Sequence, residues 1–258
     1  MNLVIDIGNT KTAFGVYKEK ELISHWTMKT DATRTADEYA LFLYHMMEFY
    51  SLHTEDCEGA MICSVVPQAD SVTAEVMEDH LRIPVRFVGP GVKTGLNILY
   101  ENPREVGADR ITNAVAGKEL YGFPLIIIDF GTATTYCYLD DKGRYLGGAI
   151  TPGMDIAMEA LAAKASKLPR VETNNTGRVI GRSTAEALQA GAHYGQLSEV
   201  EGMIQRMRTE GGAHAKVIVT GPSAHWIAQE SDKIDEAHEF LTLDGLQLIY
   251  LKNKELFS

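Results

Sequence analysis

One seven-residue motif occurs twice in this chain, each time directly after an apolar run. The first copy is Asp6-Ile7-Gly8-Asn9-Thr10-Lys11-Thr12, and the second is Asp129-Phe130-Gly131-Thr132-Ala133-Thr134-Thr135. The two aspartates lie 123 residues apart, almost half of the 258-residue chain. Both copies follow β-branched residues, contain a glycine and lead into a second strand-like run, which predicts a duplicated strand–turn–strand unit. We therefore expect an α/β architecture with an internal repeat.

The residue types at each bend are typical of a phosphate-binding turn. The glycines allow backbone N–H groups to approach a ligand closely, and such concave amide clusters bind anions. Asp6 and Asp129 need a cation between themselves and a phosphate, and Mg²⁺ typically meets one or two carboxylates together with phosphate oxygens. The motif pair therefore predicts a magnesium–nucleotide site. An aspartate–glycine pair after a strand is also common as a plain turn, and an ATP-binding structural protein would fit the repeat as well.

The overall composition argues against two classes of partner. The net charge of −11 disfavours nucleic acid and anionic membranes, because those surfaces are normally met by clustered Lys and Arg. With 45% apolar residues the chain can form a sizeable core. No run approaches eighteen apolar residues, the start lacks signal-peptide features, and the three cysteines lack metal-type spacing. We expect a reduced, cytoplasmic protein.

The pattern along the chain predicts alternating strands and helices. Residues 2–28 are typical of three strands, and Thr35-x-x-Glu38 is a capping box that opens a helix to about Tyr50. Further strands are expected at 59–66, 86–88, 125–139, 144–150 and 216–220, and helices at 67–80, 109–120, 155–164, 184–209, 223–230 and 242–251. Residues 89–108 show no clear element. The predicted domains are residues 1–115 and 116–258.

A second motif, Gly107-Ala108-Asp109-Arg110, lies where the irregular segment opens into a helix. Phosphoryl transfer to a hydroxyl needs a carboxylate that accepts or orients the proton and a cation on the transferring group, and Asp109 and Arg110 supply both. An aspartate at this position is also common as a helix cap. Tyr100 and Asn102 in the same segment line an acceptor pocket or are ordinary loop residues.

Two further glycine-containing stretches, residues 147–153 and 220–222, are candidate ligand contacts. Gly147-Gly148-Ala149-Ile150-Thr151-Pro152-Gly153 is consistent with backbone close to a ligand or with a tight connection, and Thr220-Gly221-Pro222 ends a strand where a nucleotide base can rest. The eight histidines show no ligand-type spacing and are interpreted as surface or packing residues.

Taken together, these motifs and Gly181-Arg182-Ser183-Thr184 resemble those of type III pantothenate kinase, in order and over essentially the whole chain. The resemblance implies duplicated ribonuclease H-like domains of the actin-like ATPase fold, with the active site in the cleft between them. It implies transfer of the ATP γ-phosphate to the 4′-hydroxyl of pantothenate, the first step of coenzyme A biosynthesis. It also implies a homodimer that requires Mg²⁺ and a monovalent cation, K⁺ or NH₄⁺.

Residue roles follow from the same resemblance. It assigns the ATP phosphates to Asp6, Ile7, Gly8, Asn9, Thr10, Lys11, Thr12 and Ala13, with Thr132 as a further ATP contact. It assigns pantothenate to Tyr100, Gly107, Ala108, Asp109, Arg110 and Thr184. Asp109 is the expected proton acceptor, and Asp129 is expected to hold the monovalent cation.

The chain departs from the family pattern at two positions. Pro222 stands where the family usually has glycine, and proline fixes φ and removes a donor, so nucleotide contacts of that loop are in question. Ser183 replaces the asparagine that is common before Thr184.

Two other functions share these motifs. Another small-molecule kinase of this fold would keep the phosphate turns and change the acceptor. A non-enzymatic ATP-binding accessory factor for transcription would also keep the turns, but it has no need of a base at Asp109. The amphipathic 184–209 helix is a candidate dimer element, although core packing explains it equally well.

Overall fold

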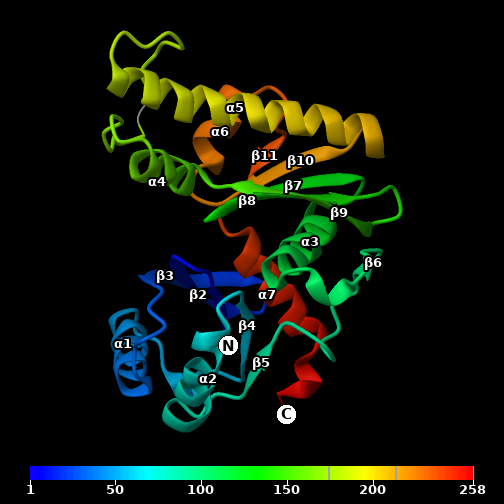
Figure 1. Cartoon of the computed structure of the whole chain (residues 1–258). Coiled ribbons are helices and arrows are strands. Elements are labelled where there is room, and N and C mark those ends of the chain that lie inside the picture. The colour runs from blue at the N-terminus through cyan, green and yellow to red at the C-terminus, as the bar shows by residue number, and fades with distance from the viewer. Residues whose placement is uncertain (174, 213, 258) are drawn as a thin grey trace. The chain divides into compact units, whose positions relative to one another are not determined.

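The computed structural model describes residues 1–173, 175–212 and 214–257. The chain forms two compact units, and each is built around one β-sheet (Figure 1). Unit 1 comprises residues 1–96, 101–120 and 240–258, and unit 2 comprises residues 97–100 and 121–239. The C-terminal helix thus joins the unit that contains the N-terminus. The division into two ribonuclease H-like domains at residues 1–115 and 116–258 stays a prediction.

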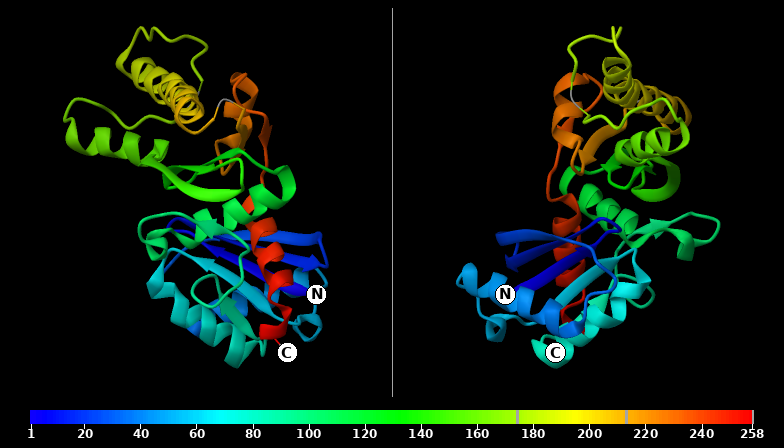
Figure 2. Two further views of the ribbon diagram at one scale, coloured as in Figure 1. Left: turned by 90° about the vertical axis from the view of Figure 1, so that its right-hand side faces the viewer. Right: turned by 60° about the vertical axis from the view of Figure 1, so that its left-hand side comes forward.

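Unit 1 contains a five-stranded sheet with helices on both faces (Figure 2). The strand order is β3-β2-β1-β4-β5. These strands are β1 (Asn2–Ile7), β2 (Lys11–Lys18), β3 (Glu21–Lys29), β4 (Ala60–Ser64) and β5 (Val85–Phe87). Helices α1 (Ala36–Phe49) and α2 (Pro67–Glu75) pack on one face, and α3 (Ala108–Tyr121) and α7 (Leu241–Lys252) pack on the other.

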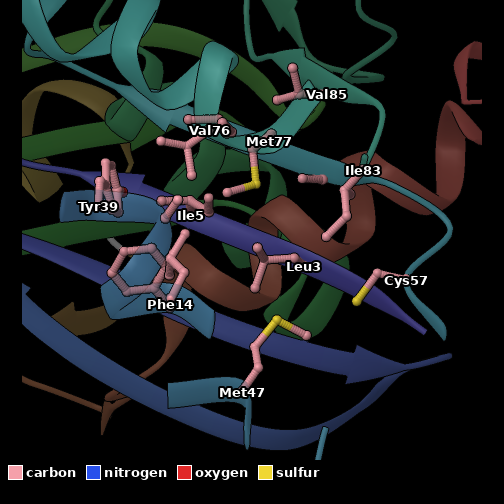
Figure 3. Close-up of a cluster of buried hydrophobic side chains, with 14 of the residues drawn as sticks. Leu3, Ile5, Phe14, Tyr39, Met47, Cys57, Val76, Met77, Ile83 and Val85 are labelled. Atoms are coloured by element: carbon pink, nitrogen blue, oxygen red, sulfur yellow. The ribbon is translucent and has the colours of Figure 1, made fainter. Parts of the chain in front are cut away.

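Alternating side chains of β1 supply the two cores of unit 1. Leu3 and Ile5 point into the cluster between the sheet and α1, where they meet Phe14 and Met47 (Figure 3). Val4 lies on the opposite face, in the cluster with α3 and α7. This alternation is the two-residue period of a strand, and because both faces are covered the strand is apolar almost throughout.

Unit 2 contains a six-stranded sheet in the order β11-β10-β7-β8-β9-β6. Its strands are β6 (Asn97–Ile98), β7 (Leu125–Phe130), β8 (Ala133–Leu139), β9 (Arg144–Pro152), β10 (Lys216–Thr220) and β11 (Glu236–Ala237). Helices α5 (Thr184–Gly211) and α6 (Ala224–Glu230) pack on one face through Val200, Ile204 and Ile227. Helix α4 (Met154–Lys164) lies beside α5 and has no buried residue.

The two sheets repeat one topology, which confirms the predicted duplication. β1 pairs with β2 antiparallel and with β4 parallel, and β7 pairs in the same way with β8 and β10. Strand β6 is an addition at the edge of unit 2. The two turns differ in length: Ile7 pairs with Thr12, whereas Phe130 pairs with Thr134. The first turn therefore holds one residue more than the second.

Most predicted elements are confirmed, and the differences concern short ones. The capping box of α1 is present, with Thr35 and Glu38 bonded reciprocally. The predicted 67–80 helix is α2 followed by one π-helical turn, Val76–His80. The segment 89–108, for which no element was expected, contains β6 and a 3₁₀ turn, Pro103–Glu105. Strand β11 was not predicted because two residues carry no periodic signal.

All three cysteines are buried and none forms a disulfide. Among the residues that the structure describes, no helix is both long and apolar enough to cross a membrane.

The crossing of α7 over α3 gives a test of the fold of unit 1. A Cβ at Gly245 would lie 2.3 Å from the backbone oxygen of Thr112, too close for any contact. We expect Gly245→Ala to lower the free energy of unfolding by about 1–3 kcal/mol, because the two helices must move apart. Thermal melting measures the effect.

Gly202→Ala is the matched control, since a Cβ at this helical position of α5 would meet only the far end of the flexible Arg206 side chain. We expect it to be neutral or stabilising by up to about 1 kcal/mol, the helix cost of glycine. Equal melting temperatures for the two variants would contradict this account of the helix crossing.

Candidate active site

The first phosphate turn is held in shape by hydrogen bonds from inside unit 1. The Gly8 N–H donates to the Lys11 carbonyl at 3.0 Å, which closes the turn. The Thr30 hydroxyl donates to the Gly8 carbonyl at 2.7 Å, and the Thr30 N–H donates to the Thr10 carbonyl at 3.0 Å. Thr30, which follows β3, therefore fixes the turn from one side. No local sequence signal identified it, because its position depends on the pairing of β2 with β3.

The side chains of this turn divide into exposed and buried groups. Asn9, Thr10 and Lys11 are exposed, so their amide, hydroxyl and ammonium groups are accessible to an anion. Thr12 is buried, and its hydroxyl lies 2.9 Å from the Thr30 hydroxyl. Ile7 is buried in the core below the turn, and Ala13 is half-buried. The predicted phosphate-binding segment thus exposes three polar side chains, while Ile7 and Thr12 are buried within unit 1.

Asp6 and Asp109, two of the three aspartates predicted for the site, both act on one buried thiol, that of Cys63. Asp6 on β1 is the register partner of Cys63 on β4, and Cys63 belongs to the cluster under α3 together with Ala108 and Ile111. Burial raises the pKa of the Cys63 thiol well above its usual range, and the charges of Asp6 and then Asp109 raise it further. The thiol stays protonated and donates a hydrogen bond to Asp6. Both predicted acids of unit 1 therefore act electrostatically on the same buried thiol, a relation that the sequence did not reveal.

Asp109 lies in the first turn of α3, and Gly107, just before the helix, has no side chain to displace the Asp109 carboxylate. Gly107 is placed so that a Cβ there would lie 2.4 Å from Asp109 Oδ1. The carboxylate thus covers the position that a side chain at 107 would occupy. Asp109 and Ala108 are half-buried, whereas the Arg110 side chain is only 5% exposed, so Arg110 is held within the protein.

The second turn, in unit 2, is surrounded by close backbone contacts. The Gly153 N–H donates to the Thr132 carbonyl at 3.1 Å, and a Cβ at Gly153 would lie 2.4 Å from the Gly131 carbonyl oxygen. Gly221 has φ +89°, and a Cβ there would lie 2.5 Å from the Phe130 carbonyl oxygen. The glycine-rich 147–153 and 220–222 stretches therefore both meet the Asp129 turn. Asp129 is half-buried, like Asp6, and Thr132 is exposed.

The remaining predicted acceptor residues lie in different surroundings. Tyr100 follows the edge strand β6 of unit 2, half-buried near Gly147 and with its ring 6.5 Å from that of Tyr145. Thr184 is exposed at the first position of α5, and Ser183 caps this helix by accepting the Glu186 N–H. Asn102 caps its own 3₁₀ turn, where its side chain accepts the Arg104 N–H.

Unit 1 therefore holds Asp6, the first turn and Gly107–Arg110, and unit 2 holds Tyr100, Asp129, Thr132 and Thr184. The shared cleft stays a prediction.

The donor set of unit 1 fits a magnesium ion bound through water and phosphate. Within the described residues, no three His, Cys, Asp or Glu side chains form a preformed metal cage. Mg²⁺ in nucleotide sites keeps several waters and needs only one or two carboxylates. Asp6, half-buried beside the turn, can supply one of them, so the ion would be completed by the nucleotide.

Comparison with solved structures identifies the fold. The chain is similar to a Campylobacter jejuni protein described as a Baf family transcriptional activator, with TM-score 0.61 and 18% identity over 98% of this chain and 99% of that one. It is also similar to a Sinorhizobium meliloti protein described as a 2-dehydro-3-deoxygalactonokinase, with TM-score 0.59 and 12% identity over 96% and 95% of the two chains. The activator of 2-hydroxyisocaproyl-CoA dehydratase from Clostridium difficile, solved with ADPNP, has TM-score 0.54 and 14% identity over 99% and 95%. These likenesses show the fold, and it is the predicted actin-like ATPase fold.

A family comparison then identifies the family. The model of type III pantothenate kinase matches residues 2–206. The chain belongs to the type III pantothenate kinase family. Family and fold together support a kinase, a phosphotransferase that uses ATP and a small-molecule substrate.

The contact between Gly107 and Asp109 gives a test of the site. We expect Gly107→Ala to displace the Asp109 carboxylate and to lower kcat by about 10–100-fold, because small misplacements of a reacting group are that costly. ATP affinity should stay close to that of the unaltered protein. Steady-state kinetics and nucleotide titration measure the two effects.

Gly89→Ala serves as control, since a Cβ there would meet nothing within 4 Å. Kinase activity that Gly107→Ala leaves unchanged would contradict the placement of Asp109.

Proposed function

We propose that this protein transfers the γ-phosphate of ATP to the 4′-hydroxyl of pantothenate, the first step of coenzyme A biosynthesis. The observation that supports the proposal is Asp109. It lies at the start of α3, within the region matched by the family model, and its charge, like that of Asp6, acts on the buried Cys63 thiol. A pure nucleotide-binding protein has no need of a second carboxylate at this position. The expected cytoplasmic location belongs to the same proposal.

In this proposal the first turn holds the ATP phosphates. Its backbone amides and the exposed Asn9, Thr10 and Lys11 supply donors and one positive charge. Thr30 keeps the turn in this conformation through the Gly8 and Thr10 hydrogen bonds. Asp6 would orient the water shell of Mg²⁺, which supplies charge neutralisation on the transferring phosphoryl group.

Asp109 is the proposed proton acceptor for the pantothenate hydroxyl. Phosphoryl transfer needs positioning, electrostatic stabilisation and one group that accepts the proton as the new bond forms. A half-buried carboxylate on a helix N-terminus, with room made by Gly107, suits this role. Gly107, Ala108 and Arg110 would line the acceptor beside it.

Unit 2 would complete the site with contacts of a different kind. Thr132 in the second turn is proposed to contact ATP, and Asp129 to hold K⁺ or NH₄⁺. Tyr100 and Thr184 are proposed to contact pantothenate. The exposure of Thr132 and Thr184 supports these assignments, since both hydroxyls are accessible to a ligand.

We also propose a homodimer that uses the groove between α4 and α5. This groove has a volume of about 400 Å³, and small and aliphatic residues such as Ala157, Leu161, Leu188 and Gly191 line most of it. No residue of α4 is buried, and Ile156 and Leu161 are 43% and 44% exposed. Apolar surface of this kind is typical of a protein interface. The expectation that α5 contributes to a dimer therefore extends to α4.

Replacement of Asp109 tests the proposed chemistry. With Mg-ATP, K⁺ and pantothenate, we expect Asp109→Asn to lower kcat by about 10²–10⁴-fold, the scale for loss of a positioned proton acceptor. ATP should still bind. Mass spectrometry of the product and ADP-release kinetics measure the outcome.

The same assay separates the competing functions. ADP release with a sugar or hydroxy acid, but not with pantothenate, would assign the chain to another small-molecule kinase. ATP binding without phosphorylation of any acceptor would support an accessory factor, and a loss confined to KM in Asp109→Asn would contradict the role of base.

The dimer has its own test. We expect the protein to sediment as a dimer at micromolar concentration and Leu161→Glu to sediment as a monomer, because the new charge would be buried without a partner. Ala163→Glu places the same charge on an exposed position of α4 that does not line the groove, and it should stay dimeric. A monomeric unaltered protein would contradict this proposal.

A further inference from the structure

The segment of residues 165–183, between α4 and α5, raises the question of what holds it. Its described residues form neither helix nor strand, and it runs directly into Ser183, the cap of α5, and Thr184. Irregular segments of this length are uncommon in compact domains, where they are usually either functional segments or linkers. The position of the segment matters because the residue that follows it, Thr184, is a proposed contact of the acceptor substrate.

Asn175 connects this segment to two helices. Its side-chain N–H₂ donates to Glu230 Oε1 at the end of α6, at 3.1 Å. Its side-chain oxygen accepts from the Tyr194 hydroxyl of α5 at 3.3 Å and from the Gly177 N–H at 2.7 Å. One amide group thus engages α5, α6 and the segment itself.

His193 holds the Glu230 carboxylate in place. His193 Nε2 lies 2.9 and 3.1 Å from the two carboxylate oxygens. The imidazole side chain is only 12% exposed and stacks on Trp226, with ring centroids 4.4 Å apart and 23° between the planes. The Tyr194 ring packs edge-on at 4.9 Å. The aromatic neighbours fix the His193 imidazole, and the imidazole in turn fixes the Glu230 carboxylate. Glu230 is therefore positioned to accept the hydrogen bond from the Asn175 side chain.

The segment also has contacts near each end. The Gln189 amide of α5 donates to the Glu172 carbonyl at 3.0 Å. The Arg182 N–H donates to Glu186 Oε2 at 2.7 Å, and a Cβ at Gly181 would lie 2.4 Å from the Ala187 nitrogen. The segment therefore lies against the first turns of α5, and Gly181 allows the close approach.

We propose that His193 and Glu230 are positioning residues that hold segment 165–183 against α5 through Asn175. By fixing this segment they fix the approach to Thr184 and so shape the acceptor side of the site. The link to the acceptor rests on the proposed function. The anchoring does not, and it is tested separately.

Limited proteolysis tests the anchoring without any activity measurement. The segment contains trypsin sites at Lys167, Arg170, Arg178 and Arg182. We expect Glu230→Ala to increase cleavage within the segment about tenfold or more, because it removes hydrogen bonds to a charged group. His193→Ala should act in the same direction, and Glu230→Gln should give a smaller increase since it keeps one acceptor. Unchanged cleavage in Glu230→Ala would overturn the proposal.

The neighbouring residue provides the matched control. Gln229 on the same helix contacts His225, and Gln229→Ala should leave cleavage unchanged. Thermal melting of each variant separates local release of the segment from loss of the fold. Equal acceleration in Gln229→Ala would show that cleavage reports the stability of α6, which would also overturn the proposal.

Kinetics test the link to the acceptor. In Glu230→Ala we expect the KM for pantothenate to rise about tenfold, with kcat and the KM for ATP nearly unchanged. The reason is that the variant would lose contacts that stabilise bound pantothenate equally in the ground state and in the transition state. Faster cleavage with an unchanged KM for pantothenate would remove the role in the acceptor site. If the unaltered protein phosphorylates no pantothenate, the proposed function fails, and the cleavage rates still decide the anchoring.

Discussion

The parallel pairing of β1 with β4 in unit 1, and of β7 with β10 in unit 2, is the constraint on which the rest of the site depends. In unit 1 this register sets Asp6 beside Cys63, and in unit 2 it sets Asp129 beside Thr220. Each aspartate is thereby fixed where a strand ends and a tight turn begins. A shift of one residue would turn these carboxylates toward the opposite face of the sheet, because side chains alternate along a strand. The apolar residues on either side of each aspartate make that shift costly.

The two turns differ although their sheets repeat one topology. The first turn is one residue longer, carries the exposed Lys11 and is fixed by Thr30. The second turn is shorter, offers no ammonium group and is surrounded by the backbone at Gly153 and Gly221. This difference supports a division in which the first turn carries the charged phosphate contacts and the second serves the nucleotide and a monovalent cation.

Local patterns predicted most of the fold, because the information for those elements lies in a few adjacent residues. The capping box at Thr35 and Glu38 predicts the start of α1, and the repeated motif predicts the paired strands. The missing information was non-local. Thr30 and Cys63 contribute through strand register, and Gly153 contributes through contact with a turn some twenty residues away. No short window of sequence shows such contacts. The role of Thr184 likewise came from the family resemblance alone, and its exposure at the start of α5 is compatible with that role.

The account is tested most directly by a crystal structure of the protein with pantothenate, Mg²⁺ and a non-hydrolysable ATP analogue. It predicts the triphosphate on the Gly8–Lys11 turn and the pantothenate 4′-hydroxyl about 2.6–3.2 Å from the Asp109 carboxylate. An acceptor hydroxyl bound far from Asp109, with its carboxylate engaged only as a helix cap, would contradict the central claim.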